Sequence, residues 1–172
     1  MVSYDGIQYQ YMAPQVFEEA YYRYVQEHLR ILSGFYGIVK PLDGVTPYRL
    51  EMQAKLKMAP CKNLYEYWGD SLYRELTRDD HVILNLASYE YSKCIEKYLT
   101  PDDRYITCVF GQLIDGKIKE KGVYVKMARG EMVRYLAERG AKEPEEAKGF
   151  DRLGFAYVEE YSDEKTYVFL MK

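Results

Sequence analysis

The chain is poor in the residues that most often carry metal and redox chemistry. Its 172 residues include three cysteines and two histidines. Cys61, Cys94 and Cys108 are widely spaced and form no Cys-x-x-Cys pair, which excludes a disulfide framework and predicts buried, inert thiols. His28 and His81 are too few for a histidine-rich metal site, so we expect neither a metal nor a cofactor.

Long apolar runs are absent as well. No stretch approaches the roughly 20 apolar residues that cross a bilayer, and the opening MVSYDGIQYQYM lacks the basic and then apolar pattern of a signal peptide. We therefore expect no membrane partner and, by default, a cytoplasmic location. The chain also has no Ser-His-Asp order, nucleophile elbow, Walker loop or HExxH helix, so no standard catalytic signature assigns an enzyme class.

The rest of the composition is typical of a globular protein. A hydrophobic fraction of 48%, a charged fraction of 30% and the lack of any linker or repeat predict a single domain over residues 1–172. The net charge of −3 argues weakly against nucleic acid, but residues 117–139 hold seven Lys or Arg against three Glu. This basic stretch either faces an anion or is an ordinary solvated face.

Hairpin signals mixed with helix signals predict an α+β fold, in which a mixed β-sheet with hairpins packs against helices. Apolar spacing predicts helices over 16–32, 63–76, 89–99 and 128–139, and a short one from Pro144. Strands are expected over 81–87, 105–114, 117–127, 155–161 and 166–171, the last two as a hairpin, and 35–40 is a short apolar segment. Asp115-Gly116 is a strong hairpin signal. We expect an irregular lead-in over the first dozen residues and a loop over 41–47.

Three segments carry more polar residues than packing requires. The first, PLDGVTPYRLEM, separates Asp43, Arg49 and Glu51 by a loop bounded by prolines. Alternation in an extended chain places Arg49 and Glu51 on one face and Tyr48 and Leu50 on the other. Arg49 suits a carboxylate or a phosphate. The alternative is a structural ion pair of Arg49 with Glu51 or Asp43.

The second segment, NLASYEYSK, follows a predicted strand and begins a predicted helix. Ser88 is the expected cap, and free backbone N–H groups at such a position attract anions. Glu90 complements the helix dipole, and Lys93 extends a positive patch. Ordinary capping without a ligand is the alternative.

In the third segment, YVKMARGEM, we expect a strand to lead into a helix, with Lys126 and Arg129 at the junction. Gly130 would let a ligand approach the backbone closely. A strand, a small turn and a helix with basic residues form a phosphate cradle. The alternative is a pair of basic residues on the surface.

These strings, with LYEYWGD between the first two, occur in the order LSGFYGIVKPLDGVTPYRLEM, LYEYWGD, NLASYEYSK, YVKMARGEMVRYL. From about Tyr4 onward the chain resembles the bacterial YaaA family of peroxide stress proteins. Family members usually begin with a strand that carries a SPAK-type sequence, for which this chain has no counterpart. The resemblance therefore implies the C-terminal two-thirds of an N-terminally truncated member. It also implies cytoplasmic protection from hydrogen peroxide and, more loosely, DNA binding.

We favour a stress protein that binds DNA or another phosphate-bearing ligand through a basic cleft, and we do not favour an enzyme. The cleft would be lined by Arg49, Lys93, Lys126 and Arg129, with Tyr48, Tyr89 or Tyr91 available to stack on unpaired bases. The alternative is an enzyme acting on a phosphorylated or anionic small molecule, with Asp43, Glu51 or Glu90 as acid or base. A third possibility is a scaffold whose polar motifs form an ion-pair network. The sequence does not indicate an oligomeric state.

Overall fold

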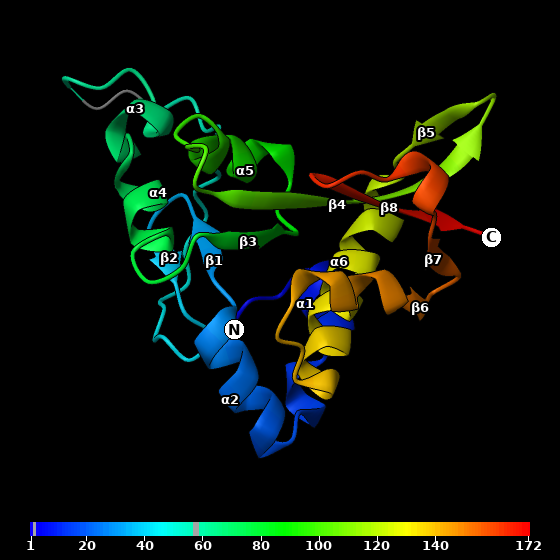
Figure 1. The fold of residues 1–172 in the computed structure, drawn as a ribbon. Coiled ribbons are helices and arrows are strands. Elements are labelled where there is room, and N and C mark those ends of the chain that lie inside the picture. Colours follow the sequence, from blue (N-terminus) through cyan, green and yellow to red (C-terminus); the bar gives the residue numbers. More distant parts are fainter. Residues whose placement is uncertain (2, 57–58) are drawn as a thin grey trace.

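The structure, a computed structural model, describes residues 1, 3–56 and 59–172 (Figure 1). Its helices are α1 (Ile7–Met12), α2 (Glu19–His28), α3 (Leu64–Trp68), α4 (Ser71–Leu76), α5 (Tyr89–Glu96) and α6 (Gly122–Arg139), with 3-10 turns η1 (Pro14–Val16), η2 (Pro144–Gly149) and η3 (Glu159–Tyr161). Its strands are β1 (Ile31–Ser33), β2 (Gly37–Val39), β3 (Val82–Asn85), β4 (Arg104–Ile114), β5 (Lys117–Lys119), β6 (Asp151–Arg152), β7 (Phe155–Tyr157) and β8 (Thr166–Met171).

A mixed sheet has the strand order β3-β4-β8-β7-β6, and β5 pairs with β4 outside that path. β3 and β8 run parallel to β4, whereas β7 runs antiparallel to β8. β1 and β2 form a separate antiparallel hairpin. In Figure 1 the long β4 joins the part of the molecule that holds α3, α4 and α5 to the part that holds β5, β7 and β8. Helices combined with this mixed sheet confirm the predicted α+β class.

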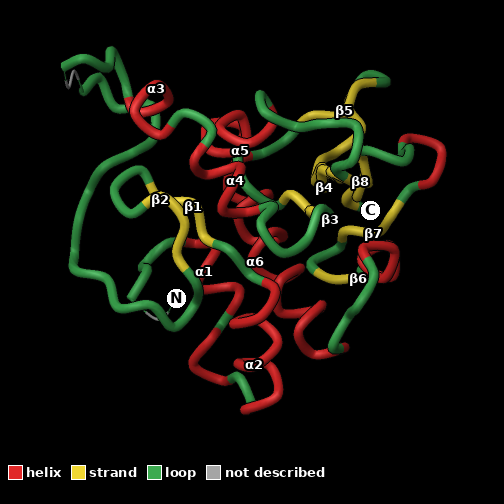
Figure 2. Tube along the Cα trace, turned by 60° about the vertical axis from the view of Figure 1, so that its left-hand side comes forward, coloured by secondary structure: helices red, strands yellow, loops and turns green. Residues whose placement is uncertain are grey.

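The buried apolar side chains form three clusters. The α6 core, between α6 and the sheet, includes Ile106, Phe110, Met132, Phe150 and Phe169. The α1 core, where α1 and α2 meet α6, includes Met12, Val25, Ile31, Val39 and Val133. The α5 core, on the other side of β3, includes Met52, Leu64, Leu72, Cys94 and Ile95. Figure 2 shows helices, in red, on both sides of the strands.

Two predicted helices are shorter or broken in the structure. The helix predicted over 16–32 is α2, which ends at His28 because Ile31 begins the β1–β2 hairpin. The helix predicted over 63–76 is divided into α3 and α4 at Gly69, whose φ is 51°. Its predicted cap is confirmed, since Asn63 Oδ1 accepts a hydrogen bond from the Glu66 N–H at 2.9 Å.

The strand predicted over 117–127 is wrong beyond Lys119. α6 begins at Gly122 because Val125, Ala128 and Met132 recur at helical spacing and are all buried. The β-branched run around Val123 and Val125 imitates a strand and hides that spacing. The Asp-Gly hairpin is confirmed, with positive φ at both turn residues, 53° and 70°.

The irregular lead-in predicted for the first dozen residues is also wrong, because α1 occupies Ile7–Met12 and packs along α6. At Gly130 a side chain would meet the Gln8 carbonyl oxygen 1.9 Å away. Gly130 therefore admits the backbone of α1, where we had predicted the approach of a ligand. The two helix backbones reach contact distance only because this residue has no Cβ.

Replacing Gly130 by Ala should destabilise the fold by roughly 2 kcal/mol or more, since the added carbon meets backbone and not a movable side chain. Gly122→Ala is the matched control, because nothing lies within 4 Å of a Cβ there. Alanine has a higher helix propensity than glycine, so the control should leave the free energy of unfolding unchanged or raise it by up to about 1 kcal/mol. Urea unfolding measures both, and equal effects would contradict the helix contact.

Asp103 joins the loop before β4 to the loop before β3. Its Oδ1 lies 2.7 Å from His81 Nδ1, and its Oδ2 accepts hydrogen bonds from the Tyr73 hydroxyl and the Thr100 N–H. Next to it, the Arg104 N–H donates to the His81 carbonyl and starts the parallel pairing of β3 with β4. Burial raises the pKa of Asp103, but these hydrogen bonds outweigh it and lower the pKa to about 2.

Asp103→Ala should therefore lower the free energy of unfolding at pH 7 by roughly 2 kcal/mol. A carboxylate with a depressed pKa stabilises the fold above its unfolded pKa of about 3.9, and this contribution is lost as the pH falls through about 2. The difference from wild type should shrink over that interval in urea unfolding at several pH values. Asp102→Ala, an exposed neighbour, should have almost no effect.

Candidate functional site

A cavity of about 690 Å³ lies where α1, β1, β3, α5 and α6 meet. Every residue from Val82 at the start of β3 to Ser88 at the start of α5 lines this cavity. The carboxyl end of a strand that leads into a helix is a common place for ligand sites in α/β sheets. The volume is in the range of small-molecule and nucleotide sites.

The structure brings some of the predicted site residues to this cavity and leaves others away from it. Those that line it are Ser88, Glu90, Lys126 and Arg129. Those that do not are Asp43, Arg49, Glu51, Lys93 and Gly130. The lining thus joins two motifs that are almost 40 residues apart in sequence.

Arg49 is an exposed cation on the loop that follows β2. Its side chain is 92% exposed and lies 3.9 Å from Glu51, the pairing that we weighed as the structural alternative. Asp43 takes no part in it, because its Oδ2 accepts from the Lys40 N–H at 2.8 Å and closes a turn. This loop therefore holds its charges toward solvent.

Lys93 rests on aromatic rings instead of the cavity. Its Nζ lies 4.0 Å from the centre of the Tyr65 ring and 5.8 Å from that of Tyr89. A hydrogen bond from its ammonium group to Tyr65 raises the pKa of Lys93. Glu90 lies nearer the cavity and accepts the Gln53 N–H through Oε1 at 3.2 Å.

Lys126 and Arg129 belong to the first two turns of α6, not to a junction of strand and helix as predicted. Three residues apart on a helix, they point to the same side, and both line the cavity. Lys126 is exposed, whereas Arg129 is half-buried. The pair thus presents one solvated cation and one partly desolvated cation.

Arg129 has an unusual environment for a guanidinium. Its Nε is buried and finds no hydrogen-bond partner within residues 1, 3–56 and 59–172. Burial lowers the pKa of Arg129, while Glu120 and Cys108 act in the opposite direction. Buried polar atoms without a partner are rare in folded proteins, and strain, a catalytic role, or a bound water or ion accounts for them.

The two buried thiols contribute no reactive group. Cys94 and Cys108 are buried, as predicted, and Cys61 is partly exposed; all three are free. Burial raises the pKa of Cys108 to about 12 and that of Cys94 to about 11, so both remain protonated at neutral pH. Within the described ranges, no group of three His, Cys, Asp or Glu side chains is placed to hold a metal ion.

Tyrosines form a second part of the lining, and the sequence analysis missed two of them. Tyr4 and Tyr9 stack at 4.9 Å, and the Tyr48 hydroxyl lies 3.4 Å from that of Tyr4 and 2.5 Å from Ser33 Oγ. Burial raises the pKa values of Tyr4 and Tyr9, so both hydroxyls stay neutral. The sequence feature that could have indicated Tyr9 is its spacing to Met12, which lies about one helical turn further along the chain.

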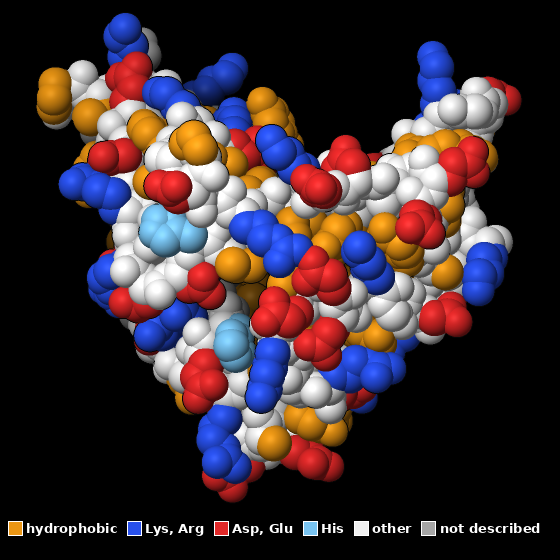
Figure 3. Space-filling model, viewed as in Figure 1, with side chains coloured by type: hydrophobic (Ala, Val, Ile, Leu, Met, Phe, Trp, Pro, Cys, Tyr) orange, Lys and Arg blue, Asp and Glu red, His pale blue; other side chains and the backbone are white. Residues whose placement is uncertain are grey.

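Of the other tyrosines named from the sequence, Tyr91 lines the cavity and burial raises its pKa to about 12. Tyr89 is 71% exposed and lies outside the lining. The charges around the cavity are mixed. Cations are Arg30, Lys126 and Arg129, and carboxylates are Glu27, Asp79, Asp80 and Glu90. Figure 3 likewise shows blue and red side chains interspersed over one face of the molecule.

No helix within the described residues is long and apolar enough to span a membrane. The fold defines an α+β protein with a cavity at the carboxyl end of a parallel strand. The chain belongs to the family described as peroxide stress protein YaaA, whose model matches residues 1–161.

Several relatives align with nearly the whole of this chain. It is 66% identical over 170 residues to a UPF0246 protein of Desulfitobacterium hafniense, covering 99% of this chain and 68% of that relative. It is 57% identical over 172 residues to a UPF0246 protein of Agathobacter rectalis, covering all of this chain and 69% of the relative. A UPF0246 protein of Pediococcus pentosaceus is 51% identical over 170 residues.

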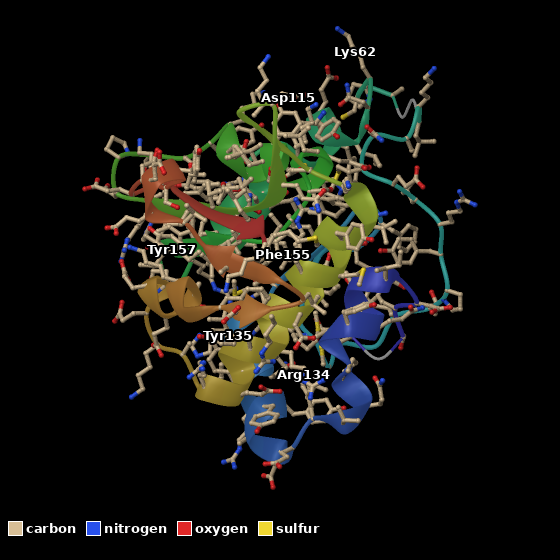
Figure 4. The ribbon with its side chains drawn as sticks, turned by 90° about the vertical axis from the view of Figure 1, so that its right-hand side faces the viewer. Lys62, Asp115, Arg134, Tyr135, Phe155 and Tyr157 are labelled. Carbon is tan, nitrogen blue, oxygen red and sulfur yellow. The ribbon has the colours of Figure 1, made fainter. Side chains whose placement is uncertain are left out.

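The buried Nε of Arg129, which has no hydrogen-bond partner in the described residues, leads to a prediction about stability. Replacing Arg129 by Met removes a charge that the fold desolvates without pairing, so the free energy of unfolding should stay the same or rise by about 1 kcal/mol. Arg134, which is labelled in Figure 4, is the control on the same helix. Its Nε donates a hydrogen bond to Glu138 at 2.7 Å. Arg134→Met should lower stability. Thermal unfolding of both variants tests this, and a large loss in Arg129→Met would show that its charge is paired.

Proposed function

We propose that this protein acts in the cytoplasmic peroxide stress response by binding a phosphate-bearing ligand, and that the ligand is DNA with unpaired bases. The observation that carries the proposal is Arg129, whose buried Nε has no partner in the described ranges and which lines the cavity together with Lys126. A guanidinium forks onto two phosphate oxygens, and burial strengthens such a contact.

The start of α5 supports the same ligand chemistry. Ser88 makes no side-chain cap, and its carbonyl oxygen accepts the N–H groups of Tyr91 and Ser92. The preceding N–H groups, of Tyr89 and Glu90, donate to no backbone or side-chain acceptor of the described residues. Free N–H groups at a helix N-terminus bind anions.

The tyrosines favour an unpaired strand over a duplex. Tyr4, Tyr9, Tyr48 and Tyr91 line the cavity. Burial raises the pKa values of Tyr4, Tyr9 and Tyr91, so these three hydroxyls carry no charge that would repel a phosphate. Base stacking on such rings stabilises single strands without sequence preference. The volume of about 690 Å³ suits a nucleotide, whereas a duplex would lie outside.

An enzyme is the second candidate, because one of the three carboxylates predicted from the sequence, Glu90, shares the cavity with the cations. Glu90 lines it beside Arg129 and Lys126, which places an acid or base near any bound anion. Glu51 and Asp43, the other carboxylates considered, lie outside the lining. The enzyme proposal therefore depends on Glu90.

The double variant Lys126→Ala/Arg129→Ala should weaken binding of a short single-stranded oligonucleotide at least tenfold. The salt dependence should become shallower by about 0.7 for each lost contact on a single strand. Lys117→Ala/Lys119→Ala removes the same charge from β5, away from the cavity, and serves as the control. Fluorescence anisotropy at several salt concentrations measures the affinity of both double variants. Equal losses of affinity would show that the effect comes from net charge and not from contacts at the cavity.

Glu90→Gln separates binding from catalysis. If Glu90 lies beside a bound phosphate, this substitution should leave the affinity for DNA unchanged or raise it, because it removes a charge of the same sign as the phosphate. Survival of peroxide challenge, measured in cells that carry the substitution in the whole protein, should then be kept. Loss of protection with unchanged anion affinity would instead favour the enzyme. Glu51→Gln, outside the cavity, is the control.

A further inference from the structure

The turn between β1 and β2 presents an aromatic ring to solvent. Phe35 is 55% exposed, although its ring centre lies 4.9 Å from that of Tyr36 and 5.5 Å from that of Tyr48. Tyr36 meets Phe35 edge to face, whereas the ring planes of Phe35 and Tyr48 are only 31° apart. Phe35 and Tyr36 lie outside the cavity lining, but Tyr48 belongs to it. A solvent-exposed ring is thus held against a ring of the cavity wall.

Tyr48 connects this exposed ring to the tyrosines inside the cavity. Its hydroxyl lies 3.4 Å from that of Tyr4, whose ring stacks on Tyr9 at 4.9 Å. Four rings therefore follow one another from Tyr9 in the cavity through Tyr4 and Tyr48 to Phe35 at the surface. Aromatic rings bind the bases of a single strand with little sequence preference, because every base has a π face.

The backbone of the turn is fixed from the side of the cavity by Ser33. Ser33 Oγ accepts the N–H groups of Phe35 at 3.2 Å and of Tyr36 at 2.9 Å. It also lies 2.5 Å from the Tyr48 hydroxyl. A serine hydroxyl has two lone pairs and one proton, so with both lone pairs engaged it donates its proton to Tyr48. One buried side chain thus sets the position of Phe35 relative to Tyr48.

The opposite side of the turn is fixed by α3 and by the loop after β2. Trp68 Nε1 donates to the Gly34 carbonyl at 3.1 Å. A Cβ at Gly34 would lie 2.6 Å from the Leu50 carbonyl oxygen, and one at Gly37, whose φ is 80°, would lie 2.9 Å from the Trp68 ring. Because the turn is held on both sides, Phe35 loses little conformational freedom when a ligand binds to it.

A cation adjoins the same row of rings. Arg49 follows Tyr48 in the chain, and its side chain is 92% exposed. Its ion-pair partner among the described residues, Glu51, is 3.9 Å away and 60% exposed, so the pair contributes little to stability. The guanidinium can therefore turn to a phosphate of a strand that passes Tyr48, at little electrostatic cost.

We propose that Phe35 is a second stacking site, which holds an unpaired base directly outside the cavity. The inference rests on the proposed function, because it extends the path of the same single strand from the cavity to the β1–β2 turn. The base stacks on the exposed surface of the Phe35 ring, and Arg49 contacts the adjoining phosphate. The ligand is then an oligonucleotide and not a mononucleotide, since one base lies in the cavity and another on Phe35.

Phe35→Leu removes the π face and keeps an apolar side chain over Tyr48. It should weaken binding of an oligothymidylate by about fivefold or more, the effect expected for one stacked base. Its affinity for thymidine monophosphate, which reaches only the cavity, should equal that of the wild type. An abasic strand of the same length carries the same phosphates without bases, so its affinity should not change either. Fluorescence anisotropy measures the two strands, and calorimetry measures the mononucleotide.

Phe35→Trp keeps an aromatic face, so it should bind the oligothymidylate at least as tightly as the wild type. The natural chain has one tryptophan, Trp68, and the wild type therefore supplies the fluorescence background. The oligothymidylate should quench the fluorescence of Phe35→Trp more than that of the wild type, whereas the abasic strand should not.

Tyr161→Leu is the matched control, because it also removes a partly exposed ring. Tyr161 belongs to η3 between β7 and β8, strands that Figure 1 shows on the other side of the molecule from β1 and β2. Its affinity for the oligothymidylate should equal that of the wild type. A loss equal to that of Phe35→Leu would overturn the stacking site.

The variants separate this inference from the proposed function. If Lys126→Ala/Arg129→Ala weakens binding of the oligothymidylate and Phe35→Leu does not, the second stacking site is wrong and the proposed function stands. If the wild type does not bind the strand, or the double variant binds it equally well, both are wrong. Equal losses for the oligothymidylate and the abasic strand in Phe35→Leu would assign Phe35 to the folding of the turn. If Phe35→Leu does not fold, as judged by circular dichroism, quenching in Phe35→Trp decides.

Discussion

The close contact between α1 and α6 at Gly130 is the constraint on which the cavity depends. Because Gly130 has no side chain, the Gln8 carbonyl reaches the backbone of α6. This contact places Tyr9 of α1, and Tyr4 just before it, on the same cavity as Arg129 of α6. Met12 and Val133 of the α1 core also line the cavity. The contact therefore holds Tyr4 and Tyr9 at the same cavity as Arg129.

Much of the fold could be predicted where local chemistry and tertiary packing agree. The Asn63 cap, the Asp115-Gly116 hairpin and the antiparallel pairing of residues 155–157 with 169–171 follow from local rules and are present. Prediction failed where the deciding contact is distant in sequence. α1 is only six residues long, so its helical pattern is weak, and its stability comes from α6 more than 100 residues away.

The site shows the same division. Ser88 and Glu90 were found because strand and helix signals adjoin in one short motif. Arg129 was found by its charge, but on the wrong element, since β-branched residues concealed the start of α6. Arg49 and Lys93 carry the same charge and lie elsewhere, one in solvent and one on tyrosine rings. Charge in a sequence therefore indicates candidates, whereas desolvation, which only the fold supplies, separates them.

Desolvation also bears on the proposed contact with a phosphate. The electrostatic energy of a cation and an anion grows as the surrounding dielectric falls, and Arg129 is already half removed from water without a hydrogen bond to its Nε. Part of the desolvation of this guanidinium therefore takes place when the chain folds, and less of it remains for the binding step. A phosphate that binds beside Arg129 would form its ion pair in a less polar environment than water, whereas the same phosphate beside the exposed Arg49 would not.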